Sequence, residues 1–241
     1  MFSSNPFFNY LLELNQEAGI ELIKAFNNSS NKKTHLIFPS IRNTLNRKRV
    51  SEQELRFAFT SLHDYNRLNY LDLNYAIEVP TTKQYQFKGL VNQRSAATDM
   101  AFFEHSERKL NIEFKAHNPD QNSFDKDLLK LVNEELPGAW CHLLENENTG
   151  TIKSVLNKIS NGLINATQSI SVSKGNNTAF SLYISILILK KNLLIVFADE
   201  NLTSNDFTSQ IASFLQTYNV KTYNSKQQGK YQIGNWYLFK L

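Results

Sequence analysis

Cysteine and glycine are scarce in this chain, and their scarcity weakens the case for several classes of site. The single cysteine, Cys141, rules out an internal disulfide and fits a reducing compartment. The eight glycines are scattered, and none belongs to a P-loop or a dinucleotide-binding turn. The sequence also lacks a G-x-S-x-G elbow and any His/Cys cluster with metal-ligand spacing. Serine-hydrolase, nucleotide-cradling and zinc-site chemistry therefore receive little support.

A long uninterrupted apolar run is missing as well. The most apolar stretch, residues 180–198, is broken by Lys190, Lys191 and Asn192, so it predicts two buried strands joined by a tight turn and not a membrane span. The first ten residues lack a basic segment followed by an apolar core, which is the pattern of a secretory signal. We therefore expect a cytoplasmic protein with no membrane partner.

The charge balance is mildly basic, with a formal net charge of +4 and a sequence pI of about 9.0. This excess suits a polyanionic partner without requiring one. The densest basic cluster contains Arg42, Arg47, Lys48 and Arg49. These side chains could hold a DNA backbone without contacting bases, since phosphate contacts position a protein but do not specify sequence. The alternative interpretation is that these four side chains only face solvent and bind no DNA.

Hydrophobic periodicity predicts alternating helices and strands along all 241 residues, with no internal repeat and no Pro- or Ser-rich linker. Helices are expected over 6–26, from 51 onward, and over 123–135, 151–164 and 205–218. Strands are expected over 75–79, 85–90, 98–103, 110–116 and 139–144, twice within 180–198, and over 231–241. This order fits an α/β sandwich in which helices flank a central mixed sheet.

We expect one domain spanning residues 1–241. Within it, residues 1–50 form a helical and basic N-terminal extension, residues 51–200 form the core, and residues 201–241 add a helix and a strand.

Residues 98–116 predict a β-hairpin with one polar face. Side chains alternate along a strand, so Glu113 and Lys115 point to one side while Ile112 and Phe114 point to the other. The apolar side can be buried, and the polar side is expected to open to solvent. Asp99 lies near the start of the first strand. Two carboxylates that can share a divalent cation, with a lysine beside them, can form a hydrolytic metal site.

Asp99, a gap, and then Glu113-x-Lys115 on an apolar strand resemble the motif of the PD-(D/E)xK nuclease superfamily. The resemblance covers roughly residues 51–150, and the Pro usually written before the Asp is Thr98 here. The order of elements is also that of a restriction-endonuclease-like core. The resemblance implies that Asp99 and Glu113 bind Mg²⁺ or Mn²⁺. It further implies that Lys115 orients the attacking water or steadies charge on the phosphate.

The same resemblance implies a biological setting. The expected activity is an endonuclease that cuts DNA in restriction or anti-phage defence, with partner proteins of a defence system and a homodimer that places one site on each strand. Two alternatives stay open. One is a non-catalytic nucleic-acid-binding or assembly module on the same fold. The other is an α/β interaction protein with no nucleic acid partner.

Four further residues have two interpretations each. The resemblance makes Glu54 a third catalytic acid and metal ligand, whereas the sequence Ser51-Glu52-Gln53-Glu54 is also a capping box at a helix start. His117 shares the predicted strand face of Lys115, so it could contact a substrate phosphate or be structural. Lys126 and Lys130 lie four apart on the following helix and could line a phosphate track. For these two lysines we favour the alternative, a solvated face.

Overall fold

One eight-stranded sheet runs through the part of the chain that the computed structural model describes, which is residues 2–41, 47–65, 71–85, 92, 94–146, 149–174, 179–218 and 230–241. Its order is β1-β2-β3-β4-β5-β6-β8-β7. The strands are β1 (Leu73–Tyr85), β2 (Arg94–Glu104), β3 (Glu107–Ala116), β4 (Gly138–Leu144), β5 (Phe180–Ile188), β6 (Leu193–Leu202), β7 (Lys230–Ile233) and β8 (Trp236–Lys240). The pairs β3–β4 and β4–β5 are parallel and the other pairs are antiparallel, so the sheet is mixed.

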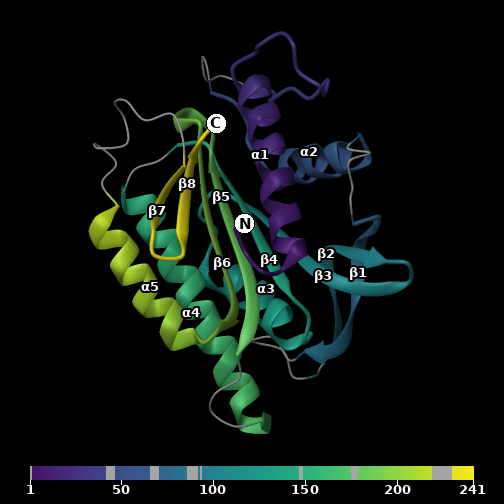
Figure 1. Cartoon of the computed structure of the whole chain (residues 1–241), viewed down its shortest axis with the longest axis vertical. Coiled ribbons are helices and arrows are strands. Elements are labelled where there is room, and N and C mark those ends of the chain that lie inside the picture. Colours follow the sequence, from purple (N-terminus) through teal and green to yellow (C-terminus); the bar gives the residue numbers. More distant parts are fainter. Residues whose placement is uncertain are drawn as a thin grey trace.

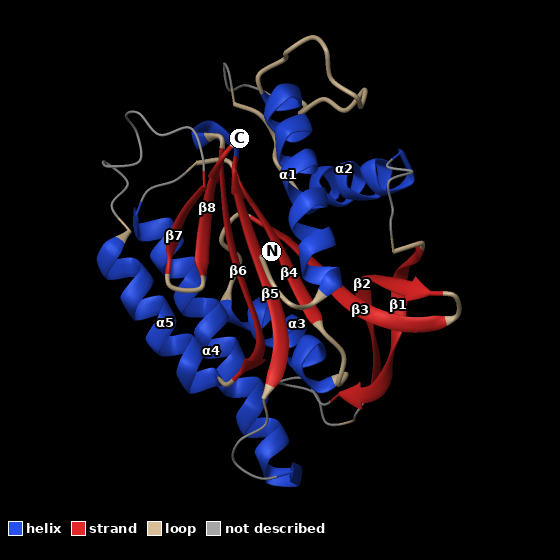
Figure 2. Cartoon of the chain, in the orientation of Figure 1, coloured by secondary structure: helices blue, strands red, loops and turns tan. Residues whose placement is uncertain are grey.

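Helices cover both faces of this sheet (Figure 1). The helices α1 (Pro6–Phe26) and α2 (Glu52–Tyr65) lie on one face. The helices α3 (Gln121–Asn133), α4 (Thr149–Lys174) and α5 (Ser204–Thr217) lie on the other. Figure 2 shows the resulting three layers, with the strands between the two groups of helices. The expected α/β architecture, a mixed sheet flanked by helices, is confirmed.

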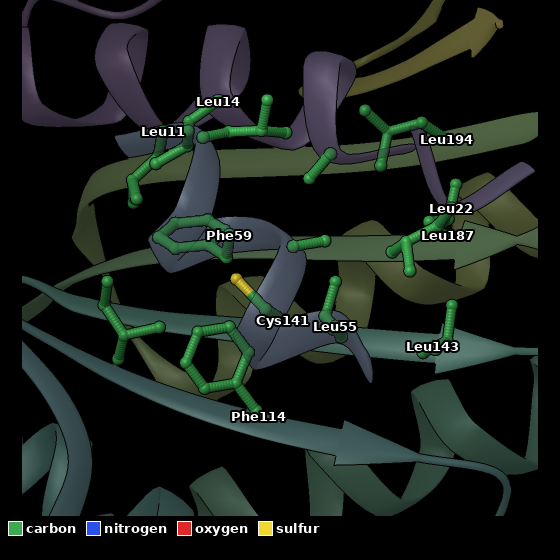
Figure 3. Close-up of a cluster of buried hydrophobic side chains, with 14 of the residues drawn as sticks. Leu11, Leu14, Leu22, Leu55, Phe59, Phe114, Cys141, Leu143, Leu187 and Leu194 are labelled. Atoms are coloured by element: carbon green, nitrogen blue, oxygen red, sulfur yellow. The ribbon is translucent and has the colours of Figure 1, made fainter. Parts of the chain in front are cut away.

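Each face of the sheet has its own hydrophobic core. On the α1–α2 face, Phe114 of β3 and Cys141 of β4 pack beneath Leu14 and Phe59 from the two helices (Figure 3). On the opposite face, Trp140 of β4 packs with side chains from α3, α4 and α5. Since neighbouring residues of a strand alternate between the two faces, the central strands are buried on both sides. This double burial decides the environment of the motif residues on β3.

Several element boundaries differ from the expected ones. β1 is longer than the predicted strand over 75–79, and α4 runs ten residues past the predicted end at residue 164. The predicted C-terminal strand is two short strands, β7 and β8, joined by a turn at Gly234, whose φ of +58° suits glycine. Of the strand predicted over 85–90, only Tyr85 is described, where it ends β1; residues 86–90 lie outside the described part of the chain.

The helix α1 belongs to the core of the molecule. The sequence assigned it to an N-terminal extension over residues 1–50, yet Phe8, Leu11, Leu14 and Leu22 are fully buried or nearly so. They pack against β5, β6 and the short 3₁₀ turn Leu189–Lys191 between those strands. Among the described helices, none has both the length and the apolar character that crossing a membrane requires.

Candidate functional site

Asp99 joins the two strands of the motif hairpin to α2. Its Oδ2 accepts a hydrogen bond from the backbone N–H of Phe114 on β3 at 2.8 Å. Its Oδ1 accepts one from Nη2 of Arg56 on α2 at 3.0 Å, and the same guanidinium reaches Glu78 of β1 at 2.9 Å. Both carboxylate oxygens of Asp99 therefore have partners, and its charge is balanced by Arg56.

Glu113 lies at the centre of a buried group of charges. Its side chain is 1% exposed, and its Oε1 lies 2.6 Å from Nζ of Lys130 on α3. Lys130 also lies 2.9 Å from Asp127 and donates to the carbonyl of Ala97 at 2.8 Å. The contact with Glu113 is an ion pair, because neither Glu113 oxygen has a hydrogen-bond partner among the described residues. Lys130 is therefore held between two carboxylates and one backbone carbonyl.

Lys115 is the motif cation that still reaches solvent. Its ammonium lies 2.5 Å from Oδ2 of Asp127, and its side chain is 14% exposed. Asp127 thus bridges the two lysines, with one oxygen near Lys115 and the other near Lys130. We name Asp99, Glu113, Lys115, Asp127, Lys130 and Arg56 the motif cluster.

The expectation of an open polar face on β3 is wrong. The helix α3 covers that face, and Asn111 and Glu113 are completely buried there. The favoured solvated position of Lys130 is wrong for the same reason, since its side chain is 4% exposed and points into the motif cluster. Lys126, one turn earlier, is exposed as expected. Asp127 and Arg56 are site residues that were not predicted from the sequence. For Asp127 a signal existed, because it lies three residues after Phe124, on the edge of the apolar stripe of α3.

Burial and charge act together on the pKa values of this cluster. Burial, and then the nearby Asp127 carboxylate, raise the pKa of Glu113 well above its usual value, although Lys130 opposes the shift. Burial by itself would lower the pKa of Lys115, but the carboxylates of Asp127, Glu113 and Asp99 outweigh it and raise the pKa. The cluster therefore holds its lysines charged and places a strong penalty on the Glu113 anion.

The motif cluster has both available and occupied carboxylate oxygens for a divalent cation. The Oε2 atom of Glu113 is buried and has no hydrogen-bond partner among the described residues, so one carboxylate oxygen is available to a cation. Both oxygens of Asp99 are occupied. No three His, Cys, Asp or Glu side chains of the described residues form a group that could hold a metal ion. Because Mg²⁺ commonly uses one or two carboxylates and keeps several waters, Glu113 with Asp99 fits this mode, provided that Arg56 yields an oxygen of Asp99.

Glu54 makes the contact expected of a capping residue. Its Oε2 accepts a hydrogen bond from the backbone N–H of Ser51 at 2.8 Å and a second from the Ser51 hydroxyl. The guanidinium of Arg49 lies 3.9 Å from its other oxygen. The side chain closes the first turn of α2, as the capping alternative predicts.

The predicted nucleic-acid contacts are divided between solvent-exposed side chains and one that is bound within the molecule. Arg47 is exposed, and the side chain of Arg49 is 63% exposed. Lys48 instead contacts the carbonyl of Phe26 and the side chain of Asn28. Arg42 lies outside the described residues. The basic cluster therefore presents Arg47 and Arg49 to solvent.

His117 does not share the face of Lys115. It lies just past the end of β3 with a φ of +60°, and its Nε2 lies 2.6 Å from the carbonyl of Val50. Val50 belongs to the core on the α1–α2 face, which is the side to which Phe114 points. The left-handed backbone turns the imidazole away from the strand face on which Lys115 lies.

A second buried polar group adjoins the motif cluster. Glu134, just after α3, accepts hydrogen bonds from the Tyr85 hydroxyl at 2.6 Å and from the backbone N–H of Thr82 at 2.8 Å. Arg108 of β3 lies 3.7 Å from Glu134 and donates to Thr98 at 3.0 Å. Four cationic and four acidic side chains thus balance one another across both groups: Arg56, Arg108, Lys115 and Lys130 face Asp99, Glu113, Asp127 and Glu134.

Comparisons of the chain with models of protein families, with curated proteins and with solved structures give no match, so the resemblance to PD-(D/E)xK nucleases rests on the motif residues and on the order of elements alone.

Proposed function

We propose that the protein is a metal-dependent nuclease of PD-(D/E)xK type that hydrolyses phosphodiester bonds in DNA. The observation that carries the proposal is the meeting of Asp99, Glu113 and Lys115 in one cluster, with a buried Glu113 oxygen left unpartnered. The order α2-β1-β2-β3-α3-β4, with β3 and β4 parallel, adds support because a restriction-endonuclease-like core has this order.

Asp99 and Glu113 would hold Mg²⁺ or Mn²⁺, which supplies a more acidic bound water and neutralises charge on the scissile phosphate. Lys115 would position the attacking water and steady charge on the phosphate, and its side chain is 14% exposed, so it still reaches solvent. An incoming phosphate would replace Asp127 as the partner of Lys115. Asp127 would keep Lys130 as its other partner, so the exchange leaves no buried carboxylate unpaired.

The wider setting follows from the resemblance. The proposal includes an endonuclease in restriction or anti-phage defence, a homodimer that cuts both strands, partner proteins of a defence system and a cytoplasmic location. The exposed guanidinium groups of Arg47 and Arg49 would contact the DNA backbone, together with Arg42 and Lys48. The resemblance also offers Glu54 as a third metal ligand and His117 as a phosphate contact. The capping bond of Glu54 to Ser51 and the contact of His117 with the Val50 carbonyl favour the structural alternative for both.

A non-catalytic nucleic-acid-binding or assembly module on the same fold is the second candidate. One observation favours it: Glu113 is buried and paired with Lys130, and every other charge of the motif cluster has a partner. Such a balanced cluster can serve the fold alone, since a buried ion pair often gives specificity of structure more than stability.

Cleavage assays separate the two candidates. Purified protein would be incubated with plasmid and with short oligonucleotides in Mg²⁺, in Mn²⁺ or in chelator. We expect cleavage only with metal, and we expect Lys115→Ala and Asp99→Ala to abolish it while DNA binding persists. Lys109→Ala is the matched control, because Lys109 lies on the same strand but pairs with Glu104 and Glu107 outside the cluster.

If Lys115→Ala cuts as fast as the parent, the chemistry assigned to the motif is wrong. If the parent binds DNA but cuts nothing with either metal, the non-catalytic module takes its place.

A further inference from the structure

A cavity of about 610 Å³ lies beside α2, outside the motif cluster. Its walls come from residues 33–37 and from one side of α2. This volume falls within the range of pockets that hold small ligands. Nothing in the proposed mechanism uses it.

Exposed aromatic side chains form the rim of this cavity. Phe57 and Tyr65 of α2 are 51% and 69% exposed, and Ile37 on the facing segment is 64% exposed. Phe57 and Tyr65 are eight residues apart, about two helical turns, so they lie along one side of the helix. Large apolar side chains that gather around an open cavity, and do not scatter singly, mark a binding surface.

The charge of the rim favours an anionic ligand. The lining includes Lys33 and His35, and none of the described lining residues is a carboxylate. The Lys33 ammonium lies 5.8 Å from the centre of the Tyr65 ring, while Glu17, which pairs with it at 3.2 Å, lies outside the lining. The hydroxyl of Thr34 in the wall is buried and has no partner among the described residues. The cavity thus combines flat aromatic faces, a cationic rim and an unpaired polar atom.

The helix α2 connects this cavity to the motif cluster. Arg56 points to Asp99, and the next residue, Phe57, points to the cavity. The two sites therefore lie on neighbouring sides of α2, about 100° apart around its axis. A strand whose backbone lies at the motif cluster could pass around the helix to the cavity.

We propose that the cavity beside α2 takes up an unpaired base of the DNA strand whose backbone lies at the motif cluster. The base stacks on Phe57 and Tyr65, and Lys33 contacts the adjoining phosphate. Aromatic faces accept every base, so this contact holds single-stranded DNA without strong sequence preference. The choice of DNA as the polymer rests on the proposed function, whereas the binding itself needs no cleavage.

The test measures binding in chelator, where the metal-dependent reaction is stopped. Fluorescently labelled single-stranded DNA would be compared with an oligonucleotide of the same length whose residues are abasic but keep every phosphate. Stacking contributes roughly 1–3 kcal/mol per base, which corresponds to about five- to 150-fold in affinity. We expect the parent to prefer the normal strand by such a factor, and Phe57→Ala/Tyr65→Ala to lose the preference.

Tyr231→Ala is the control, because Tyr231 is 44% exposed on β7, the edge strand farthest in the sheet order from β1. It should bind as the parent does, and the melting temperatures of all variants should agree, since the substituted side chains are exposed. Equal affinity of the parent for normal and abasic strands would overturn the inference. So would tighter binding of a free nucleoside monophosphate or of an apolar peptide than of the oligonucleotide.

The two proposals fail in different ways. Metal-dependent cleavage of duplex DNA without a preference for bases in chelator would leave the nuclease proposal intact and remove the base-binding cavity. A preference for bases that depends on Phe57 and Tyr65, without cleavage in any metal, would support the cavity and remove the nuclease.

Discussion

At the scale of the residue, Lys130 is the partner on which the buried Glu113 depends. Removing one member of a buried ion pair leaves an uncompensated charge and costs about 3–5 kcal/mol. We expect Lys130→Met to lower the free energy of unfolding by about that amount in urea titration. The exposed Lys126 on the same helix supplies the control, since Lys126→Met should stay within about 0.5 kcal/mol of the parent.

The double variant Glu113→Gln/Lys130→Met removes both charges and should recover much of the loss. If Lys130→Met melted like Lys126→Met, Glu113 would be protonated in the parent at the pH of the experiment and would not need its partner.

His142 makes the free energy of unfolding depend on pH. It is buried beside Trp140, whose Nε1 donates to Nδ1 at 3.2 Å, so Nε2 carries the proton and donates to the carbonyl of His117. Burial first, and then nearby positive groups led by Lys115, lower the pKa of His142 from 6.5 to about 4. Between pH 6.5 and about 4, His142 therefore binds a proton in the unfolded chain but not in the folded chain.

The contribution of His142 to stability is complete above pH 6.5 and falls as the pH is lowered toward about 4, by roughly 3 kcal/mol at about 1.4 kcal/mol per pKa unit. Urea titrations of the parent and of His142→Gln at pH 7 and pH 5 measure it. The parent should lose more stability on acidification than the variant, and parallel losses would contradict the assignment.

At the scale of the element, a substitution at the start of α2 tests whether Glu54 is a helix cap or a metal ligand. Glu54→Ala removes the acceptor for the backbone N–H of Ser51, and such a loss costs about 1 kcal/mol, as for other helix caps. We expect lower melting with unchanged cleavage rate. Glu52→Ala, in the same turn but without that bond to Ser51, is the control. Lost cleavage with unchanged melting would instead make Glu54 a metal ligand.

Most elements could be predicted from the sequence because their apolar residues repeat with the period of a helix or a strand. The hairpin over 98–116 and the strands on either side of Asn192 are of this kind. The later part of α4 was missed because residues 165–174 lack an apolar stripe. The turn between β7 and β8 was missed because a single Gly234 interrupts an apolar run.

The candidate site could be predicted only in part. Alternation along β3 identified Glu113 and Lys115, but alternation cannot tell whether water or another element covers a polar face. The helix α3 covers it, with Asp127 and Lys130 among its apolar residues. That packing is a property of the assembled layers, and no local pattern on β3 reveals it.

At the scale of the whole molecule, two cores share one sheet, and this predicts a single unfolding transition. Trp140 and Trp236 both lie in the core on the α3–α5 face, whereas Leu14 lies in the core on the α1–α2 face. Leu14→Ala should lower stability by about 2–5 kcal/mol. Both cores depend on the same strands. The unfolding midpoints of Leu14→Ala measured by tryptophan fluorescence and by far-UV circular dichroism should therefore fall by the same amount.

The exposed Glu13→Ala, one position away, is the control for that comparison. If Leu14→Ala lowered the midpoint of the circular dichroism transition but not that of the fluorescence transition, the α1–α2 layer would unfold independently of the rest. The single domain expected over residues 1–241 would then be divided in two.

The alternation of β3 between a charged and an apolar side also has a consequence for how the chain finds its fold. A slip of one residue in the pairing of β3 with β4 would turn Glu113 and Lys115 toward the core around Phe59 and Cys141, where the described residues include no charged side chain in the hydrophobic cluster. Two unpartnered ions there would cost far more than the few kilocalories per mole that hold a protein together. The charges on β3 thus make a misaligned pairing of this strand energetically unfavourable.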